Sequence, residues 1–553
     1  MPTNILLDFH VPVIRRSGLR ERAAPWQITD RLGEDPILDV DAPRASLRSA
    51  YFHLLVGFLQ TFRMPSDGKA WVEAFTAPPA PAELKSAFAP QAAHFESRSI
   101  GSSFMEERGI TLEGKGPLPV ALLAMEGPGD NTLDLNQDFF NKRGAVRGLC
   151  RACAAMVLFE LQVNAGSGGR GHRTSVRGGG PLSTFVIPRA GQEQEATLWE
   201  KLWANVLDAK EWPEGVCTQA AAVFPWVRGP RVGEDAPPVV PSNAPGLTML
   251  WGMPRRVELV EGETVGGVCD QCGTACGALV EAFYAQSNGE NYGLWEHPYS
   301  PHRNAVVDKA TKVEGLLPIH ASRSEVGFET WPRMVFPVDK GAPARVVTAM
   351  MAHGSRKTVL ARQTGWSIWA HGFETDNAKV LGFWSSELPL IVPPNGVSPQ
   401  RITDQAQRMV EGAKMAQKVL RWAVKMAWFR APDKRGDPEF LDQALMTAAE
   451  DSFFADLKVF SNGLLPDDEA NDEDLRDQVG GSWGSTLRHI AEQIFVTWVD
   501  RGQDEMDPRR AAAGRQYLRG VLRSDKFCGV LGMRIPEKTK ASKTKPTAQK
   551  GTA

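Results

Sequence analysis

The sequence lacks any long apolar run. Its longest apolar stretches, Val120–Met125 and Tyr51–Phe62, are short or interrupted by polar residues, and a membrane-spanning helix needs roughly 18–20 apolar residues. The first residues also lack a basic segment followed by an apolar one, so a secretory signal is not expected. We therefore expect a cytoplasmic protein with no membrane partner.

The sequence is also short of net charge and of familiar catalytic motifs. The 553 residues carry a formal net charge of −2, so any nucleic-acid site must come from a local cluster of charge. H-E-x-x-H and the P-loop are missing, which argues against a zinc protease and a P-loop nucleotide hydrolase. We therefore do not expect an enzyme.

Cysteine is scarce, but four of the seven cysteines form two spaced pairs. Cys150 and Cys153 are separated by two residues, as are Cys269 and Cys272. This spacing lets both sulfurs of a pair reach one ion, and two pairs supply the four thiolates of tetrahedral zinc. Four thiolates leave no open position, so the predicted zinc is structural. Cys276 competes with Cys272 as the fourth ligand, and four reduced, buried cysteines without metal remain the alternative.

Residues 141–181 combine the first thiol pair with many glycines and basic residues. Glu160 is the only acid there, and the basic residues are Lys142, Arg143, Arg147, Arg151, Arg170, Arg173 and Arg177. Residues 166–171 match the dinucleotide pattern G-x-G-x-x-G through Gly166, Gly168 and Gly171, with Gly169 at a variable position. That interpretation fails, because no helix pattern follows and the next acid is Glu193. The segment is then either a flexible surface loop or a loop whose backbone approaches a phosphate-bearing partner, which its arginines favour.

The pattern of apolar residues predicts an α+β fold in two main domains. Residues 1–395 read as a large, irregular mixed α/β domain that contains the zinc knuckle. The expected elements there are a strand over 4–13, a helix over 46–62, β-rich runs at 184–187, 256–260 and 345–350, and a buried segment over 154–163 whose composition favours a helix although its length also allows a strand.

The second main domain, residues 400–530, reads as a four-helix bundle. We expect helices over 402–427, from Asp437-Pro438 to Asn462-Gly463, over 485–499 and over 507–522. Residues 531–553 form a basic tail that is predicted to be disordered.

The first predicted bundle helix has a packing seam of small and medium-sized residues at alternating steps of four and three: Ile402, Ala406, Met409, Ala413, Ala416, Leu420, Ala423 and Ala427. It also carries a separate basic stripe. Its members fall at steps of four, three and four residues: Lys414, Lys418, Arg421 and Lys425. Such a stripe is commonly a solvated face. The alternative is contact with a nucleic-acid strand or with a neighbouring subunit.

Ordered landmarks along most of the chain resemble the CasA family, the large subunits of type I-E CRISPR Cascade surveillance complexes. The landmarks are Asn4-Ile-Leu-Leu-Asp8 with Val11-Pro-Val13, the two thiol pairs, Arg177-Gly-Gly-Gly-Pro181 with Thr184-Phe-Val186, Leu250-Trp251, Val257-Glu-Leu259, Leu294-Trp-Glu-His-Pro-Tyr-Ser-Pro301, Gly372-Phe-Glu-Thr-Asp-Asn-Ala-Lys379 and the closing helices. The order and spacing of the landmarks carry the resemblance, since no single one is diagnostic.

The resemblance implies a subunit that senses the protospacer-adjacent motif (PAM) of double-stranded DNA through the minor groove. The groove is only about 6 Å wide, which suits a glycine backbone; the implied contacts are Gly166, Gly168, Gly169, Arg170, Gly171 and Arg173. Asp376, Asn377 and Ala378 match the family's wedge, which opens the duplex for guide-RNA pairing; an ordinary turn is the alternative. The implied partners are the guide RNA, the other Cascade subunits and a helicase-nuclease.

The family's groove-entering lysine has no counterpart here. The segment from Cys272 to His302 contains no lysine, and the side chains that offer amide groups in its place are Gln286, Asn288 and Asn291. The alternatives to the whole assignment are a zinc-stabilised scaffold without a DNA role and an unrelated zinc- or nucleotide-dependent enzyme.

Overall fold

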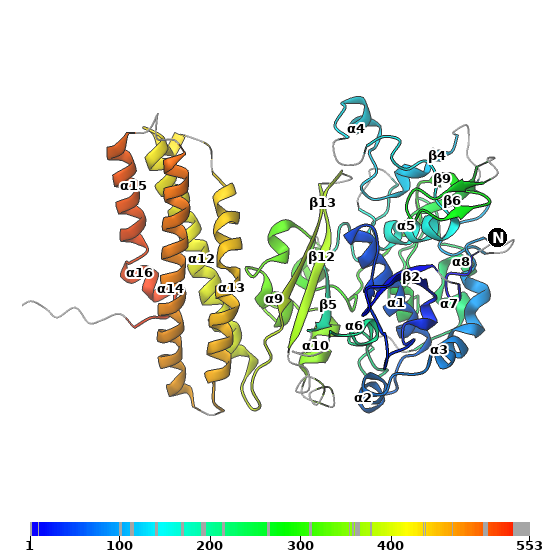
Figure 1. Ribbon diagram of the computed structural model, residues 1–553, viewed down its shortest axis with the longest axis horizontal. Coiled ribbons are helices and arrows are strands. Elements are labelled where there is room, and N and C mark those ends of the chain that lie inside the picture. Colours follow the sequence, from blue (N-terminus) through cyan, green and yellow to red (C-terminus); the bar gives the residue numbers. More distant parts are fainter. Residues whose placement is uncertain are drawn as a thin grey trace, which may run out of the picture. The chain divides into compact units, whose positions relative to one another are not determined.

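Two buried helices form the centre of the first part of the chain. They are α1 (Ala45–Phe62) and α5 (Arg151–Asn164), and they contact each other. The computed structural model shows other elements around both (Figure 1). Nearly every residue of both helices is buried, polar ones included, as expected for helices that are covered on all sides. The prediction of a buried helix over 154–163 is confirmed, and the strand alternative is wrong.

The structure describes residues 3–534 apart from 9, 99–101, 111–115, 139–141, 167–170, 190–194, 213–215, 263–265, 309–311, 353, 355, 357–358, 360–364, 377–378, 435, 437, 467 and 502–506. The chain divides into two compact units, Met1–Val392 and Pro393–Ala553. Within the described residues, no helix is both long and apolar enough to cross a membrane.

Aromatic rings fill the space beside α1. Phe58 of α1 lies 5.4 Å from Phe95 and 5.6 Å from Trp251, measured between ring centroids. A Cβ atom on Gly57 would lie only 3.2 Å from the Trp251 ring, so the missing side chain lets the indole pack directly on the helix. The indole N–H donates to Thr61 Oγ1 at 3.1 Å, which satisfies its one buried polar atom.

Antiparallel strands build the small sheets of the first unit. The sheet orders are β2-β1-β3, β4-β9-β6, β13-β12-β5, β7-β8 and β10-β11. The strands are β1 (Val11–Arg15), β2 (Arg20–Ala23), β3 (Ile37–Val40), β4 (Leu118–Pro119), β5 (Ser183–Pro188), β6 (Arg256–Glu261), β7 (Gly267–Val268), β8 (Ala275–Cys276), β9 (Val280–Gln286), β10 (His302–Asp308), β11 (Val313–Pro318), β12 (Trp366–Asp376) and β13 (Lys379–Pro389).

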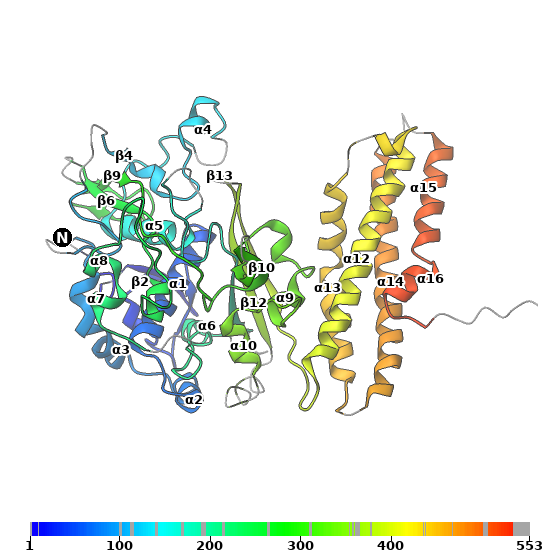
Figure 2. The same cartoon turned by 180° about the vertical axis from the view of Figure 1, so that it is seen from behind.

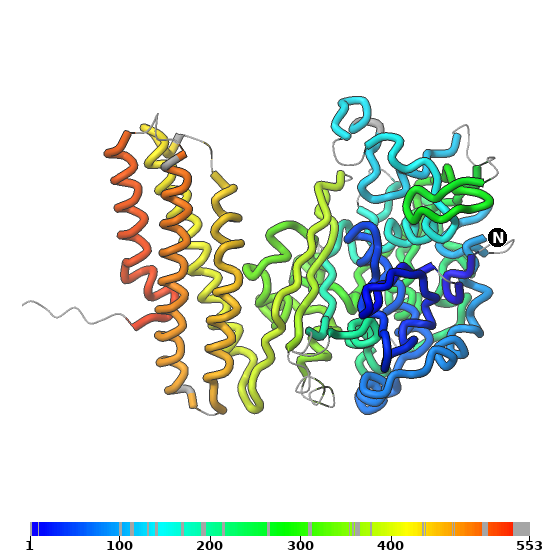
Figure 3. Tube along the Cα trace, viewed as in Figure 1, coloured from blue at the N-terminus to red at the C-terminus, as the bar shows by residue number. Residues whose placement is uncertain are grey.

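Short helices connect these strands. They are α2 (Gly68–Thr76), α3 (Pro81–Phe88), α4 (Asp130–Asp134), α6 (Leu198–Trp203), α7 (Ala220–Val223), α8 (Pro225–Arg228), α9 (Trp331–Val335) and α10 (Arg345–Met351). The first unit is thus a mixed α/β body, as predicted, and its irregular course is visible in the Cα trace (Figure 3).

Two strand predictions in this unit are wrong. The run at 345–350 is the helix α10, because packing of Val346, Val347 and Met350 in the core outweighs the weak strand preference of β-branched residues. Near the start, the strand begins only at Val11. Asn4 and its neighbours form a turn, since its Oδ1 accepts from the backbone N–H groups of Leu6 and Leu7 at 3.1 and 3.0 Å.

The second unit is a bundle of four long helices among its described residues, with one short helix after them. The helices are α12 (Pro399–Trp428), α13 (Phe440–Gly463), α14 (Glu469–Asp500), α15 (Pro508–Val521) and α16 (Asp525–Val530). They run alongside one another in both ribbon views (Figures 1 and 2). The α+β fold class predicted from the sequence is therefore confirmed.

The seam of α12 explains how the bundle packs. Its predicted inward residues are all fully buried: Ile402, Ala406, Met409, Ala413, Ala416, Leu420, Ala423 and Ala427. Their small size lets the neighbouring helices approach closely. Gly514 of α15 shows how close: a Cβ atom there would lie 2.6 Å from the Ala423 carbonyl oxygen.

The predicted third bundle helix is much too short. It was expected from residue 485, whereas α14 begins at Glu469. Residues 469–477 are mostly acidic and polar, so they lack an apolar period, but Arg401 of α12 pairs with the buried Asp472 and holds this turn. The second helix was expected to begin at Asp437-Pro438; Asp437 lies outside the described residues, and α13 begins at Phe440 after Glu439.

Candidate functional site

The four cysteines of the two pairs lie together. Each sulfur atom of Cys150, Cys153, Cys269 and Cys272 lies within 4.8 Å of the other three. The sulfurs of Cys150 and Cys272 are 3.8 Å apart, although 122 residues separate them in the sequence. Cys276 stays outside this cluster, and its thiol donates to the Thr274 carbonyl at 3.3 Å. Of the two candidates for the fourth position, the structure therefore places Cys272 in the cluster.

Two local structures present these sulfurs. Cys150 is the N-cap of α5, and its sulfur accepts from the Cys153 N–H at 3.4 Å, so one helix start aims both thiols of the first pair. The second pair lies on the turn between β7 and β8, where the Cys269 carbonyl accepts from Gly273 N–H at 2.8 Å. The Asp270 carboxylate joins the two structures, because it accepts from the backbone N–H groups of Arg147 and Gly148 at 2.6 and 2.9 Å.

The donor set fits a zinc ion. Zinc–sulfur bonds of about 2.3 Å in a tetrahedron place neighbouring sulfurs about 3.8 Å apart, close to the spacing found here. Hydrogen bonding with Cys153 lowers the pKa of Cys272 to about 5, and hydrogen bonding with Cys150 lowers the pKa of Cys269 strongly. Hydrogen bonding with Cys150 raises the pKa of Cys153, and the pKa of Cys150 is raised as well. Two of the four thiols therefore favour the thiolate form, and a bound metal would displace the protons of the other two. What the cluster can do chemically is hold a closed, structural ion, because four sulfurs leave no position for substrate.

The glycine segment, residues 166–181, follows the C-terminal end of α5. It packs on the turn after β9. Of its predicted contact residues, Gly168, Gly169 and Arg170 lie outside the described residues, while Gly166 and Gly171 are placed. Gly171 has φ +79°, and a Cβ atom on it would lie 2.5 Å from Ser287 Cβ. Its carbonyl accepts from the Asn288 N–H at 2.7 Å. Glycine is required here for both its backbone angle and its lack of volume.

The other end of the segment packs against strand β12. Gly180 has φ +60°, and a Cβ atom there would lie 2.6 Å from the Phe373 carbonyl oxygen and 3.0 Å from Thr375 Oγ1. Phe373 and Thr375 belong to the last residues of β12 before its hairpin ends. The structure therefore connects the glycine segment with the β9 turn at one end and with the β12–β13 hairpin at the other.

The predicted wedge lies at the end of that hairpin. Asp376 closes β12 and pairs in register with Lys379 of β13; Asn377 and Ala378, between them in the sequence, lie outside the described residues. A bulge between Glu374 and Thr375 interrupts the register just before the end. Bulges bend a strand and re-aim its side chains, and Trp384 Nε1 donates to Glu374 at 2.5 Å beside it.

Arg177 does not line a surface; it is buried in the core. Its guanidinium donates to the Val163 carbonyl at 3.1 Å and to Ser183 Oγ at 2.5 Å. Burial lowers the pKa of Arg177 to about 9, and among the described residues no carboxylate pairs with it. The expectation that Arg177 favours a phosphate is therefore wrong. The carbonyl end of α5, with its partial negative charge, compensates the cation.

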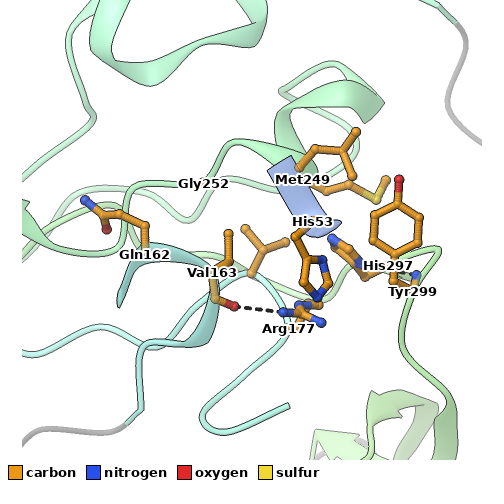
Figure 4. A pocket seen from close by; sticks show the side chains of 10 residues that line it. His53, Gln162, Val163, Arg177, Met249, Gly252, His297 and Tyr299 are labelled. Atoms are coloured by element: carbon orange, nitrogen blue, oxygen red, sulfur yellow. Dashed lines mark hydrogen bonds between the residues drawn. The ribbon is translucent and has the colours of Figure 1, made fainter. Parts of the chain in front are cut away.

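Histidines surround this buried cation. Figure 4 shows His53, Arg177 and His297 beside a small cavity, with Tyr299 on its wall. The cavity leaves about 20 Å³ in which the centre of a water molecule can move, enough for one water. Burial, followed by the charge of Arg177, lowers the pKa of His53 and of His297 well below the usual value. Both imidazoles are therefore neutral, and the group acts as a fixed anchor for the end of the glycine segment.

Two other basic residues of 141–181 are neutralised by acids. Arg143 pairs with Asp138 at 3.0 Å, and Arg151 is buried in a salt bridge with Glu106. Glu160, the one acid of the stretch, is held by Arg44 at 3.3 Å. A count of charge within the stretch alone overstated its basic character, because the compensating acids Asp138 and Glu106 lie outside it.

Arg255 and Arg173 also lie near the glycine segment, and only Arg173 was predicted as a contact. Arg255 Nη2 donates to the Gly166 carbonyl at 2.5 Å, and burial lowers the pKa of Arg255 to about 10. Arg173, a predicted contact, is half-buried and donates to the Glu234 carbonyl at 3.0 Å. The dipeptide Arg255-Arg256 at the start of β6 was the only signal for Arg255, and it resembles any basic strand edge.

The basic stripe of α12 is divided by the structure. Lys414 and Lys418 are exposed. Arg421 instead pairs with Asp442 of α13 at 3.2 Å, and the Lys425 ammonium lies 5.8 Å from the Trp422 ring centroid. The stripe is therefore a free basic surface over its first half only.

Comparison with known proteins gives a consistent result. A sequence model of the family described as CRISPR-associated protein Cse1 matches residues 4–494. Cse1 from Acidimicrobium ferrooxidans is 18% identical, with a TM-score of 0.64 over 96% of this chain and 99% of that chain. Thermus thermophilus CasA (Cse1) is 15% identical, with a TM-score of 0.64 over 94% and 99%. A chain of a CRISPR RNA-guided surveillance complex is 15% identical, with a TM-score of 0.64 over 95% and 100%.

Proposed function

This chain belongs to the CRISPR-associated Cse1 family, and on that premise we propose that it is the large, non-catalytic subunit of a type I-E Cascade complex. In this role it works in the cytoplasm with guide RNA and the other Cascade subunits. A structure of a CRISPR RNA-guided surveillance complex contains a chain of the same fold, which supports the proposal. All seven cysteines are free thiols, as suits a reducing compartment.

The proposed activity is recognition of the PAM in duplex DNA through the minor groove, followed by opening of the duplex. One observation carries it: the glycine segment packs through Gly171 on the β9 turn and through Gly180 on β12, the strand that leads to the wedge. The glycine segment that senses the motif and the hairpin that opens the duplex would then be rigidly connected. Arg173, Arg255 and the backbone of Gly166 and Gly171 supply positive charge and backbone groups that suit a narrow groove.

The wedge is assigned to Asp376, Asn377 and Ala378. The β12–β13 register brings Asp376 opposite Lys379, so the hairpin is narrow where it would meet a base pair. Insertion beside the motif costs a few kcal/mol of unstacking, which contacts to the neighbouring phosphates must offset. Lys414 and Lys418 are proposed contacts for a displaced strand or a neighbouring subunit, and docking of the helicase-nuclease on this subunit belongs to the same proposal.

The proposed zinc is structural, held by Cys150, Cys153, Cys269 and Cys272. Such an ion supplies a crosslink and no reaction chemistry. The knuckle lies at the first residue of α5, and the glycine segment leaves the last. The ion would therefore fix the helix from which the segment starts.

The decisive experiment uses the reconstituted complex and labelled duplexes with and without the motif. We expect Asn377→Ala combined with Gly168→Asp to abolish R-loop formation, since the new carboxylate repels the phosphates that line the groove. The matched control is Gly33→Asp, because Gly33 is exposed and a Cβ atom there would meet nothing within 4 Å. Unchanged R-loop formation by the double variant would contradict the PAM assignment and leave a zinc-stabilised scaffold as the better description.

A further inference from the structure

The cavity beside the buried guanidinium of Arg177 has no part in the proposed function. It leaves about 20 Å³ for the centre of a bound particle, which is room for one particle of about the size of a water molecule. Figure 4 shows Arg177, Tyr299, His53 and His297 on its wall. None of the described residues that line it is acidic. An anion inside the cavity would therefore meet no negative side chain.

The guanidinium of Arg177 is only partly used by its protein partners. It donates from Nη1 to Ser183 Oγ at 2.5 Å, and from Nη2 to the Val163 carbonyl at 3.1 Å and to Asn164 Oδ1 at 3.4 Å. A guanidinium carries one N–H on Nε and two on each Nη. The Nε–H and the second Nη1–H of Arg177 have no acceptor in the described part of the chain. Since buried polar groups are almost always paired, these two donors point to a further partner.

The charge of Arg177 is also only partly compensated. The carbonyl end of α5 carries about half of a negative elementary charge, and no carboxylate among the described residues pairs with the guanidinium. Burial lowers the pKa of Arg177 only to about 9, so the group stays positive at neutral pH. A buried charge without a full counter-charge is costly. A small anion beside the guanidinium would remove this cost.

Tyr299 supplies a second donor to the same cavity. Its side chain is buried, and its hydroxyl forms no hydrogen bond with any residue that the structure describes. The imidazoles on the wall are already engaged: His53 Nε2 lies 3.1 Å from Ser183 Oγ, and His297 Nδ1 accepts from the Tyr299 N–H at 3.3 Å. A phenol can donate to an anion but adds no charge of its own. The cavity thus combines one cation and one neutral donor that both lack a partner.

We propose that this cavity is a binding site for a single chloride ion, held by the guanidinium of Arg177 and the hydroxyl of Tyr299. Chloride consists of one atom and is only slightly larger than a water molecule, whereas sulfate, phosphate and carboxylates exceed the volume. A water molecule would accept the same hydrogen bonds but would leave the charge uncompensated. Chloride also suits the apolar part of the wall, which includes Val163, Val176 and Met249, because it gives up its hydration more easily than a smaller anion does.

The bound ion would connect two segments that are far apart in the sequence. Arg177 belongs to the glycine segment, residues 166–181, and Tyr299 lies shortly before β10. An ion that contacts both side chains would become part of the anchor that holds the end of the glycine segment. The inference does not depend on DNA recognition, because contacts in the core alone carry it.

The test measures thermal unfolding of the full chain at several chloride concentrations, with sodium gluconate added to keep the ionic strength constant. A ligand that binds only the folded state raises stability with the logarithm of its concentration once it exceeds its Kd. For the unit Met1–Val392, each tenfold rise in chloride above the Kd should raise the unfolding midpoint by about 2 °C. Equal midpoints in chloride and gluconate would overturn the proposal.

Three variants assign the effect to this cavity. Tyr299→Phe keeps the ring and should weaken chloride binding about 10-fold or more, since it removes a hydrogen bond to a charged group. Arg177→Met should abolish the chloride dependence; if it does not fold, Tyr299→Phe still tests the site. The matched control is Tyr51→Phe, because Tyr51 is also buried but its hydroxyl lies 3.3 Å from the His10 carbonyl oxygen, outside the cavity. A purely structural loss lowers the midpoint equally in chloride and gluconate. Wild-type chloride dependence in Tyr299→Phe, or an equal weakening in Tyr51→Phe, would overturn the proposal.

Bromide gives a direct measurement of occupancy. It has the charge of chloride and a similar size, and its anomalous X-ray scattering distinguishes it from water. Crystals of the full chain grown in bromide should show an anomalous peak within hydrogen-bond distance of Arg177 and Tyr299. Density at this position without an anomalous signal would identify a water molecule as the occupant and overturn the proposal.

Discussion

Removing zinc from the cysteine cluster should destabilise the first unit by a predictable amount. The metal would join residues that are 122 positions apart, as Cys150 and Cys272 are. The chain-entropy relation for a crosslink of this span gives about 5 kcal/mol of stabilisation. Unfolding entropy of about 2.1 cal/mol/K per residue, applied to Met1–Val392, gives roughly 0.8 kcal/mol/K. The expected fall in the midpoint of thermal unfolding is therefore about 6 °C.

The assay combines elemental analysis with thermal unfolding, before and after treatment with a chelator. We expect one zinc per chain in the wild type, and none in Cys153→Ser. The unfolding midpoint of Cys153→Ser should not respond to the chelator, while that of the wild type should fall. Comparing each protein with and without chelator removes the separate cost of placing a hydroxyl at the buried position of Cys153.

Cys276→Ser is the matched control, because this thiol lies only a few residues from the cluster and outside it. It should keep its zinc and its unfolding midpoint. A wild-type protein without zinc would refute the metal assignment. Zinc retained by Cys153→Ser, or lost by Cys276→Ser, would refute the assignment of ligands.

Three further predictions test the glycine segment, the bundle and His10, a buried histidine whose Nε2 lies 2.7 Å from the Ile5 carbonyl oxygen. Gly171→Ala should cost about 1–3 kcal/mol, because it strains a left-handed backbone and meets Ser287; urea unfolding measures it, and a neutral result would contradict the close packing. Burial lowers the pKa of His10 to about 4, below the unfolded value of about 6.5, so the unfolded state binds the extra proton and stability falls as pH drops from 6.5 toward 4. Between pH 7 and 5 the wild type should lose about 2 kcal/mol more than His10→Gln, and equal losses would contradict this. Gly514→Ala should destabilise the bundle by about 1–3 kcal/mol, whereas Gly520→Ala, which meets no atom within 4 Å, should stabilise it by up to about 1 kcal/mol; effects of the same sign would contradict the packing.

Local patterns predicted those features that depend on neighbouring residues. The inward seam of α12 follows from helical periodicity, and its members are buried as expected. The clustering of the four cysteines was predictable because two cysteines separated by two residues, occurring twice, are typical of metal sites. Both signals require only a few residues that act together, so a single sequence contains them.

Features that depend on distant partners were not predictable. Arg177 looked like a surface cation because the carbonyl end of α5, which compensates it, is not visible as an acid in the sequence. The start of α14 was missed because Asp472 gains its partner, Arg401, from another helix. Arg255 gave no signal, since its position depends on the carbonyl of Gly166. Tertiary contacts decided each of these cases.

Helix α5 has 14 residues, so it is about 21 Å long. The thiol knuckle fixes its first residue, and the buried guanidinium of Arg177 fixes its last turn. One inserted residue would rotate everything beyond it by about 100° and shift it by about 1.5 Å, which would separate one of these two attachments. Insertions and deletions among natural relatives should therefore be absent from residues 151–164 and collect in the segments that flank them. The length of α5 should therefore be constant among relatives, while the lengths of the segments on either side of it can vary.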